Sequence, residues 1–404
     1  MTMTKTSIQA AVLAACAFMA AMANAEIPAA GLKIGVMTDM SGQFAAFSGP
    51  GSVAAAEIAV EEFGGKINGK PISVLSFDHQ NKPDVAALGT RQWFDEGVNM
   101  AVDYPVSPAA LAAQEVAREK KRIIIFSSAG TPALSRKACS PYGFQWTMDT
   151  YSLANGLAAP LAKQGVESFY FVSADYAGGK AIEDEFRRAL DRQKLKALDG
   201  VKFPLNSPDM SAYVMSAQAS AAKGIVIAGA GGDLTNILKT ARSFGLTDGG
   251  KTIVAPSAFL TDVKGLGLEV TQGLMFVDPF YWDRDESSRR FAQKFYAKRK
   301  AMPTAPQSGV YSAVLHYLKS VQAANSVDAD LVAAKMRETL VNDDMVKNGR
   351  IRPDGRLAHD MSLVRVKKPS QSKGEWDLLE IIANIPAEQT VPPLSESECP
   401  LVKK

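Results

Sequence analysis

Short apolar runs alternate with alanine-rich stretches of helical length along most of this 404-residue chain. The first series holds the runs "LKIGVMTDM", "KPISVLSFDHQ", "NMAVDYPVS" and "RIIIFSSAG", with helices expected at 52–63, 84–96 and 109–120. A second series follows Trp146 and holds "SFYFVSADY", "LDGVKFPL", "GIVIAGAGG" and "KTIVAPSAF". Strands that are almost continuously Val, Ile and Leu are typical of parallel sheets covered by helices on both faces. The pattern predicts an α/β protein with two doubly wound lobes.

The last third of the chain has a different pattern. Residues 287–340 are mainly helical, and "GRLAHDMSLVRVKK" and "WDLLEIIANI" then alternate as antiparallel strands around a polar turn. The Pro/Ser/Glu-rich stretch after Ile385 is expected to be an extended tail. With 47% hydrophobic residues, the chain can bury two domain cores.

The amino terminus has the pattern of a secretory signal. Lys5 precedes an apolar run from Ile8 to Met22, and Ala23-Asn24-Ala25 forms an A-x-A site, so we expect cleavage after Ala25. A retained membrane anchor is disfavoured because the run is short for a bilayer span of about 20 residues. Lipidation at Cys16, in "LAAC", is an alternative that would leave an apolar mature terminus.

Export bears on the two remaining cysteines, Cys139 and Cys399. In an oxidising compartment a disulfide between them is the simpler interpretation, with two free thiols as the alternative. The bulk charge is nearly balanced, with 45 Lys+Arg against 42 Asp+Glu and no basic arm. A nucleic-acid partner is therefore not expected.

The glycine-rich stretch after the first strand, Gly49-Pro50-Gly51-Ser52-Val53-Ala54, satisfies G-x-G-x-x-A. A dinucleotide fingerprint needs its first glycine directly after the strand, so that the backbone turns beneath the pyrophosphate. Here Gly49 lies nine residues beyond Met40, and Pro50 lacks an N–H donor. We therefore interpret the stretch as a helix entry and expect no nucleotide cofactor.

Two other strand ends favour an anion. Ser107-Pro108 follows "AVDYPV" and Thr131-Pro132 follows "IIIFSSAG", so each pair places a hydroxyl at a helix N-cap and proline at the first turn. Carboxyl ends of neighbouring parallel strands lie together, and free N–H groups there attract negative charge. Plain capping explains either motif alone. The pair predicts a carboxylate cradle.

Catalytic signatures are weak. The three histidines, His79, His316 and His359, are far apart in sequence, and G-x-S-x-G, H-E-x-x-H and C-x-x-C are all missing from it. We expect no catalytic residues and no metal. An enzyme assembled from distant residues is the alternative.

Taken in order, five segments of the chain resemble the periplasmic solute-binding proteins of the branched-chain amino acid type. These segments are "IGVMTDMSGQFAAFSGPGSVAAAEIAVEEFGG", "GKPISVLSFDHQNKPDVAA", "IIIFSSAGTPALS", "FVSADYAGGKAIEDEF" and "TARSFGLTDGGKTIVAPSAF". The resemblance implies a type I periplasmic-binding clamshell of two lobes joined by three crossovers. It also implies the following division: signal 1–25, first lobe 31–147 with 279–357, second lobe 148–278 with 358–385, and tail 386–404.

Site residues carry over where the chain matches the family's pattern. The resemblance implies ligand contacts from a set drawn from both lobes: Phe47, Tyr104, Ser107, Ala129, Gly130, Thr131, Tyr176, Ala230 and Ser257. Tyr104, Asp39 and Trp282 are the weaker candidates. Core packing is the alternative for Phe47 and Tyr176, and plain capping is the alternative for Ser107 and Thr131. The weaker candidates could simply line the rim.

Two departures from the family concern the ligand. The family's carboxylate for an amino-acid ammonium is replaced by Ser257, and an aromatic side chain by Ala230 and Gly231. An uncompensated ammonium is costly to bury, so an organic acid lacking the amine becomes as plausible as a hydrophobic amino acid. Asp39, Asp103 or Asp233 could supply the missing charge.

The resemblance further implies a function and a partner. A protein of this family binds a small solute in the periplasm and delivers it to the permease of an ATP-driven importer. We expect a monomer. A secreted sensory domain with the same two-lobed fold is the alternative.

Overall fold

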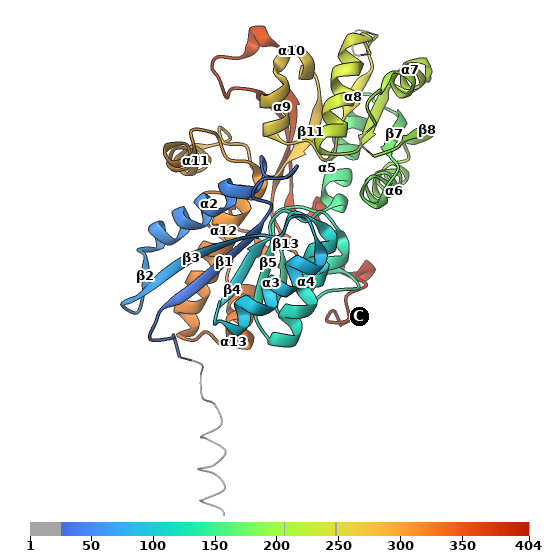
Figure 1. The fold of residues 1–404 in the computed structure, drawn as a ribbon. Coiled ribbons are helices and arrows are strands. Elements are labelled where there is room, and N and C mark those ends of the chain that lie inside the picture. Colours follow the sequence, from blue (N-terminus) through green and yellow to red (C-terminus); the bar gives the residue numbers. More distant parts are fainter. Residues whose placement is uncertain (1–25, 206, 247–248, 404) are drawn as a thin grey trace, which may run out of the picture.

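A computed structural model describes residues 26–205, 207–246 and 249–403, and its ribbon divides into two lobes, each built on its own sheet (Figure 1). The predicted signal, with Ala25 and Cys16, lies outside the described residues. The first sheet has six strands in the order β2-β3-β1-β4-β5-β6. Their bounds are β1 Leu32–Thr38, β2 Lys66–Ile67, β3 Lys70–Asp78, β4 Met100–Asp103, β5 Ile123–Phe126 and β6 Gly143–Gln145. All pairs except β2–β3 are parallel.

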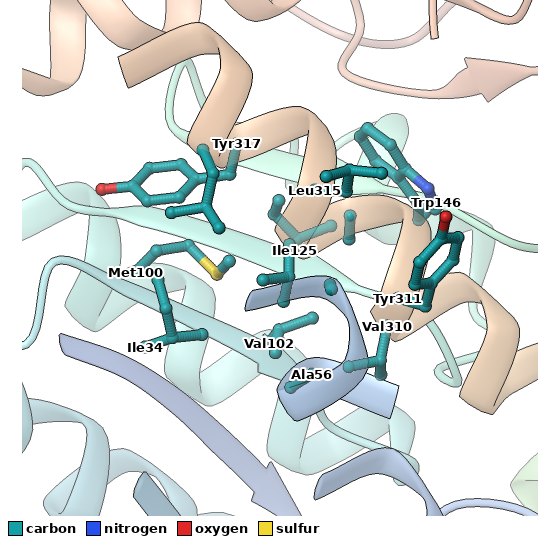
Figure 2. Close-up of a cluster of buried hydrophobic side chains, with 14 of the residues drawn as sticks. Ile34, Ala56, Met100, Val102, Ile125, Trp146, Val310, Tyr311, Leu315 and Tyr317 are labelled. Carbon is teal, nitrogen blue, oxygen red and sulfur yellow. The ribbon is translucent and has the colours of Figure 1, made fainter. Parts of the chain in front are cut away.

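Both faces of this sheet are covered, because alternate side chains of each strand point to opposite faces. Ile34, Val102 and Ile125 pack under one layer of helices, whereas Met37 and Ile124 pack under another. Figure 2 shows the first of these faces meeting Val310 and Leu315. The first layer is α2 Gly49–Phe63, α12 Ala305–Ala324 and α13 Ala329–Glu338, with α11 Glu286–Arg299 beside α2, and the second layer is α3 Pro83–Asp95 and α4 Ser107–Lys120.

The second sheet has seven strands in the order β15-β14-β11-β10-β9-β7-β8. The predicted antiparallel pair is confirmed: β14 pairs antiparallel with both β11 and β15, and the other neighbours are parallel. The bounds are β7 Ser168–Ala174, β8 Lys196–Phe203, β9 Gly224–Ala228, β10 Thr252–Val254, β11 Met275–Asp278, β14 Met361–Val366 and β15 Leu379–Ile385.

Helices cover both faces of the second sheet as well. Val226 and Val254 face one cluster, and Ile225 and Ile253 face the other. The first cluster lies under α5 Thr150–Lys163 and α6 Ala177–Arg192. The second lies under α7 Ser211–Ala219, α8 Gly231–Ser243 and α9 Leu260–Leu266, which the short α10 Leu268–Thr271 follows. The predicted fold class, two doubly wound α/β lobes, is confirmed.

The chain crosses between the lobes three times: after β6, after β11 and before β14. Hydrogen bonds tie the first and third crossings together. His359 Nε2 lies 2.9 Å from the Thr147 carbonyl oxygen, and Arg356 Nη1 donates to the Trp146 carbonyl oxygen at 3.0 Å. The hairpin β12 Arg350–Ile351 with β13 Leu357–Ala358 precedes the third crossing. The exact lobe boundaries stay a prediction.

The expected extended tail is wrong in one respect, because much of it packs on the body. It contains two 3₁₀ turns, η3 Ala387–Gln389 and η4 Leu394–Glu396. Thr390 is fully buried, and Cys399 is bonded to Cys139 near the end of the first lobe's sheet. The bonded cysteines are 260 residues apart in sequence, so the disulfide links the polar tail to the first lobe and holds it in place. Among the described residues, none of the helices has the length and apolarity that a membrane crossing needs.

Candidate ligand-binding site

The carboxyl ends of the strands in the two lobes face each other through their loops. Phe47, in the loop after β1, stacks on Phe259, in the loop after β10, with ring centroids 4.4 Å apart and planes at 22°. Nearby, a Cβ atom at Gly231 would lie 3.9 Å from Oε1 of Gln43. The predicted aromatic Phe47 therefore lies at the contact between the lobes.

The loop after β1 is held at its base by Asp39. One carboxylate oxygen of Asp39 accepts from the N–H of Gly42 at 2.7 Å, and the other accepts from the N–H of Phe44 at 3.0 Å and from Nδ2 of Asn81 at 2.7 Å. Burial opposes ionisation of Asp39, but the hydrogen bonds from Asn81 and the backbone outweigh it and lower the pKa. Asp39 is thus a buried, ionised anchor of the loop.

The turn after β5, at residues 129–131, turns its carbonyl groups into the protein. Buried Gln145 donates from Nε2 to the carbonyl oxygens of Ala129 at 3.1 Å and Thr131 at 2.9 Å, and Thr150 N donates to that of Gly130 at 2.9 Å. Because N–H and C=O point in opposite directions in a trans peptide, the N–H groups of Gly130 and Thr131 point away from these donors. Such a turn can present paired N–H groups to an anion.

Thr131 is confirmed as an N-cap, but of a short 3₁₀ turn, η1 Pro132–Ser135. Its Oγ1 accepts from Ala133 N at 3.3 Å, which leaves its own hydroxyl hydrogen free to donate elsewhere. The prediction for Ser107 is off by one position. Helix α4 begins at Ser107 itself, and Val106 is its N-cap without a side-chain cap. The helix therefore starts one residue earlier than predicted, and Ser107 is its first residue and not its cap. The Ser107 side chain is half-buried.

A buried carboxylate behind these loops was underestimated from the sequence. Asp103 ends β4 with a φ of 95°, a strained value for a residue with a side chain. Its Oδ1 accepts from Ser127 Oγ at 2.8 Å and from Ser128 Oγ, and its Oδ2 accepts from Ser48 Oγ. These three hydroxyls hold the fully buried carboxylate in place.

The neighbouring His79 is also fully buried. Its Nδ1 accepts from Asn81 N at 2.9 Å, and its Nε2 has no hydrogen-bond partner among the described residues. Burial lowers the pKa of His79, and the charges of Asp103 and Asp39 oppose that shift. The result is a neutral imidazole beside two acids.

Tyr104 was predicted to contact the ligand, with a place at the rim as the alternative, and its burial in the core corrects both. Its side chain is fully buried, its hydroxyl is 2.6 Å from Thr90 Oγ1, and its ring packs edge-on against Phe126. Asp103 and Tyr104 both have positive φ, a backbone twist that a strand pattern does not reveal and that places the ring in the core. Trp282 packs against both lobe cores and donates from Nε1 to the Trp376 carbonyl oxygen at 2.9 Å.

The second-lobe candidates lie at loops after β7, β9 and β10. Tyr176 is the N-cap residue of α6 and its side chain is 37% exposed. Burial of part of this ring raises the pKa of Tyr176, and Asp233 in the first turn of α8 adds to the shift. Ala230 and Ser257 are half-buried. Nothing in the geometry assigns them to a ligand, so the set stays a prediction.

Sequence reasoning missed Gln145, Ser48, Ser127 and Ser128. A signal existed for three of them, since Gln145 interrupts the apolar run "FQW" and Ser127-Ser128 directly follow the strand "IIIF". Polar residues at such places need buried partners, but the sequence does not say which. Among the described residues, no group of three or more His, Cys, Asp or Glu could hold a metal ion.

Two α/β lobes joined by three crossovers, with strand ends opposed, define a two-lobed solute-binding protein of the type I fold. The chain belongs to the periplasmic binding protein family, whose model matches residues 31–375.

Two relatives are similar over nearly the whole chain. A periplasmic binding protein from Burkholderia mallei is 44% identical, with a TM-score of 0.87, and the match covers 93% of this chain and 100% of that one. A branched chain amino acid ABC transporter periplasmic ligand-binding protein from Burkholderia xenovorans LB400 is 38% identical, with a TM-score of 0.88, covering 92% and 100%.

A more distant structure shares the fold alone. A solute binding protein of an ABC transporter from Rhodopseudomonas palustris BisB5, in complex with 3,4-dihydroxy benzoic acid, is 20% identical with a TM-score of 0.77. That match covers 88% of this chain and 97% of the other.

Proposed function

We propose that this protein is the substrate-binding component of an ABC importer and captures a small carboxylate-bearing solute between its lobes. The observation that carries the proposal is the turn at residues 129–131, whose three carbonyl groups are engaged by Gln145 and Thr150. The N–H groups of Gly130 and Thr131 and the hydroxyl of Thr131 then form a donor set for one carboxylate. No lysine or arginine is needed for this recognition.

The rest of the ligand would lie between Phe47 and the second-lobe loops at Tyr176, Ala230 and Ser257. A ligand that contacts both lobes stabilises their closed arrangement, because only that arrangement offers all contacts at once. Leucine-like amino acids and aromatic acids both fit this chemistry. A relative named for branched-chain amino acid transport and a fold neighbour bound to a dihydroxybenzoate support the same two classes.

In this proposal the mature chain begins after Ala25 and acts in the periplasm as a monomer that docks on a membrane permease. Calorimetry of the mature protein with leucine, phenylalanine and benzoate tests the ligand class. We expect saturable binding of at least one of the three. Binding of a sugar or an organic cation, with none of the three acids bound, would contradict the donor set.

The residue-level test is Thr131→Val, which keeps the shape and removes the hydroxyl. The expected loss of binding free energy is about 1–3 kcal/mol, because the lost donor faces a charged acceptor. Thr390→Val is the matched control, since its buried hydroxyl donates to Ala387 O in the tail. Equal affinity of Thr131→Val and the unaltered chain removes Thr131 from the site.

A further inference from the structure

The second lobe donates one hydrogen bond into the turn at residues 129–131. Thr150 is the first residue of α5, which packs in the second-lobe core, and its N–H donates to the Gly130 carbonyl oxygen at 2.9 Å. The two residues are in close contact, since a Cβ atom at Gly130 would lie 4.0 Å from Cγ2 of Thr150. The other two carbonyl groups of the turn accept from Gln145 of the first lobe. The turn is therefore held from both lobes.

The two proposed N–H donors of the turn are positioned by different lobes. A peptide unit is planar and trans, so fixing its carbonyl group also fixes the direction of the N–H in the same unit. The Ala129 carbonyl and the Gly130 N–H belong to one unit, which Gln145 holds. The Gly130 carbonyl and the Thr131 N–H belong to the next unit, which Thr150 holds. A first-lobe side chain thus aims one donor, and a second-lobe helix aims the other.

The start of α5 makes the Thr150 N–H both available and rigid. The first N–H groups of a helix have no acceptor within the helix. In α5 the capping box uses the third position, because Ser152 N donates to Asp149 Oδ1 at 2.8 Å and Asp149 N donates to Ser152 Oγ at 3.0 Å. The N–H of Thr150 is left to bond outside the helix, and the cap fixes its direction.

Two more contacts join this part of the first lobe to second-lobe helices. The guanidinium of Arg136, which follows the 3₁₀ turn η1, lies 5.6 Å from the centroid of the Tyr151 ring in the first turn of α5. Nη1 of Arg136 is also 4.0 Å from Oε2 of Glu185, a buried side chain of α6. The segment that carries the turn therefore lies against the second lobe, next to the first crossing.

We propose that Thr150 is a positioning residue whose N–H aims the Thr131 N–H at the ligand carboxylate, so that rotation of the second lobe and recognition of the carboxylate are coupled. This inference rests on the proposed function and deepens it. Rotation of α5 about the first crossing moves the Thr150 N–H and so turns the peptide unit between Gly130 and Thr131. Conversely, a carboxylate on the Thr131 N–H polarises that unit and strengthens the bond from Thr150, because hydrogen bonds in a chain reinforce one another.

Thr150→Pro tests the proposal, because proline is preferred at the first position of a helix but has no N–H. The extended backbone of Asp149 suits the residue before a proline. The proline ring takes the place of the N–H, so the Gly130 carbonyl has to turn away and the Thr131 N–H turns with it.

Calorimetry measures the effect with leucine, phenylalanine and benzoate, each compared with leucinamide, phenylalaninamide or benzamide. For each acid that binds the unaltered chain, Thr150→Pro should weaken binding roughly fivefold or more, because the misdirected N–H faces a charged acceptor. The preference for the acid over its amide should fall roughly threefold or more. A merely loosened fold would weaken the acid and the amide equally.

Two variants are the matched controls. Thr150→Ala keeps the N–H and removes the side chain, so the affinity should change less than about twofold. Glu286→Pro places proline at the first position of α11, which also begins with an aspartate cap and has serine at the third position. The Glu286 N–H has no backbone acceptor among the described residues, so this variant should also change the affinity less than about twofold.

Hydrogen exchange of the unaltered chain gives a second test that needs no variant. Saturation with the acid that binds, whether leucine, phenylalanine or benzoate, should raise the exchange protection of the Thr150 N–H roughly threefold or more. The Ser288 N–H, which is bonded to Asp285 at the start of α11, should keep its protection unchanged.

The outcomes separate this inference from the proposed function. If none of the three acids binds the unaltered chain, the proposed function fails and this inference fails with it. If an acid binds, but Thr150→Pro keeps its affinity or loses acid and amide equally, only the inference is overturned. Unchanged protection of the Thr150 N–H in the saturated protein overturns it as well.

Discussion

The loops at the strand ends differ between the two lobes in how firmly side chains hold them. In the first lobe, Asp39 accepts three hydrogen bonds and Gln145 donates two, so both loops are fixed before any ligand arrives. The helix starts do not differ, since α6 and α8 begin without a side-chain cap, as α2, α3 and α4 do in the first lobe. The difference lies in the loops of the second lobe, where the Tyr176 ring is 37% exposed. The fixed loops of the first lobe reduce the entropy cost of binding a ligand, because they are already ordered. The less constrained loops of the second lobe can adapt to the ligand when the lobes close.

Gln145→Leu should lower the free energy of unfolding the most, because it removes the side chain that holds the first-lobe turn at residues 129–131. The change leaves the buried carbonyl oxygens of Ala129 and Thr131 without a donor, and each unsatisfied group costs about 1–3 kcal/mol. We expect the free energy of unfolding to fall by about 2–6 kcal/mol. Urea denaturation followed by circular dichroism measures this loss.

Gln218→Leu, in α7 of the second lobe, is a control for the loss of an exposed glutamine. Gln218 is exposed and donates to the Phe244 carbonyl oxygen at 3.3 Å, so its removal should cost less than about 0.5 kcal/mol. Similar losses for the two variants would show that the turn at residues 129–131 does not depend on the hydrogen bonds of Gln145.

The disulfide gives the next largest effect, and it also concerns the first lobe. Cys399→Ser releases the tail from Cys139, and a crosslink of this kind typically contributes about 2–4 kcal/mol. The measurement is the urea midpoint of the variant against the unaltered chain. Adding a reductant to the unaltered chain should reproduce the loss, and an unchanged midpoint in both experiments would mean that the cysteines are not bonded.

As the pH falls, the first lobe and the crossings between the lobes should lose stability at a higher pH than the second lobe does. Burial lowers the pKa of His316, in α12, and of His359, at the third crossing, to about 4. The native state binds fewer protons than the unfolded state between these values and 6.5, so the stabilisation present above pH 6.5 is lost as the pH falls toward 4. We expect on the order of 1–3 kcal/mol per histidine.

Denaturation at pH 7 and pH 4.5, compared between the unaltered chain and His359→Gln, isolates this contribution. The variant should be less stable at pH 7 but should lose less on acidification. Since the three histidines of the chain all lie outside 148–278, the amides of that segment should keep their exchange protection longer than those around His316 and His359. An equal acid loss in both proteins would contradict the assignment.

The fold was predictable because it rests on repetition. Val/Ile/Leu runs such as "IIIF" form strands buried on both faces, and that composition is read directly from the sequence. The predicted helix at 109–120 begins at Ser107 instead, because the proline of the first turn marks a helix start without fixing which neighbour is its cap. The strands β6 Gly143–Gln145 and β11 Met275–Asp278 were missed, since "GFQ" and "MFVD" lack the continuous Val/Ile/Leu run that marks "IIIF".

The site was less predictable, since it depends on where side chains turn. Thr131 was identified as a cap because capping is local. Tyr104 was misplaced because two successive positive φ angles send its ring into the core. Gln145 was missed because its two acceptors lie 14 and 16 residues away along the chain.

Tyr176→Phe should have the smallest effect of these variants, a small loss of ligand affinity, and it tests the less constrained loops of the second lobe. The variant keeps the ring and removes the hydroxyl, which is worth about 0.5–1.5 kcal/mol if it pairs with the ligand. In the proposed function Tyr176 joins the site only when the lobes close, and on that proposal its loss should raise the dissociation rate and leave the association rate nearly unchanged. Stopped-flow fluorescence with the ligand found by calorimetry separates the two rates. Thr131→Val, in the fixed half, should by comparison lose more affinity. If Tyr176→Phe costs more than Thr131→Val, the second lobe is the principal recognition surface, and the contrast between the lobes is reversed.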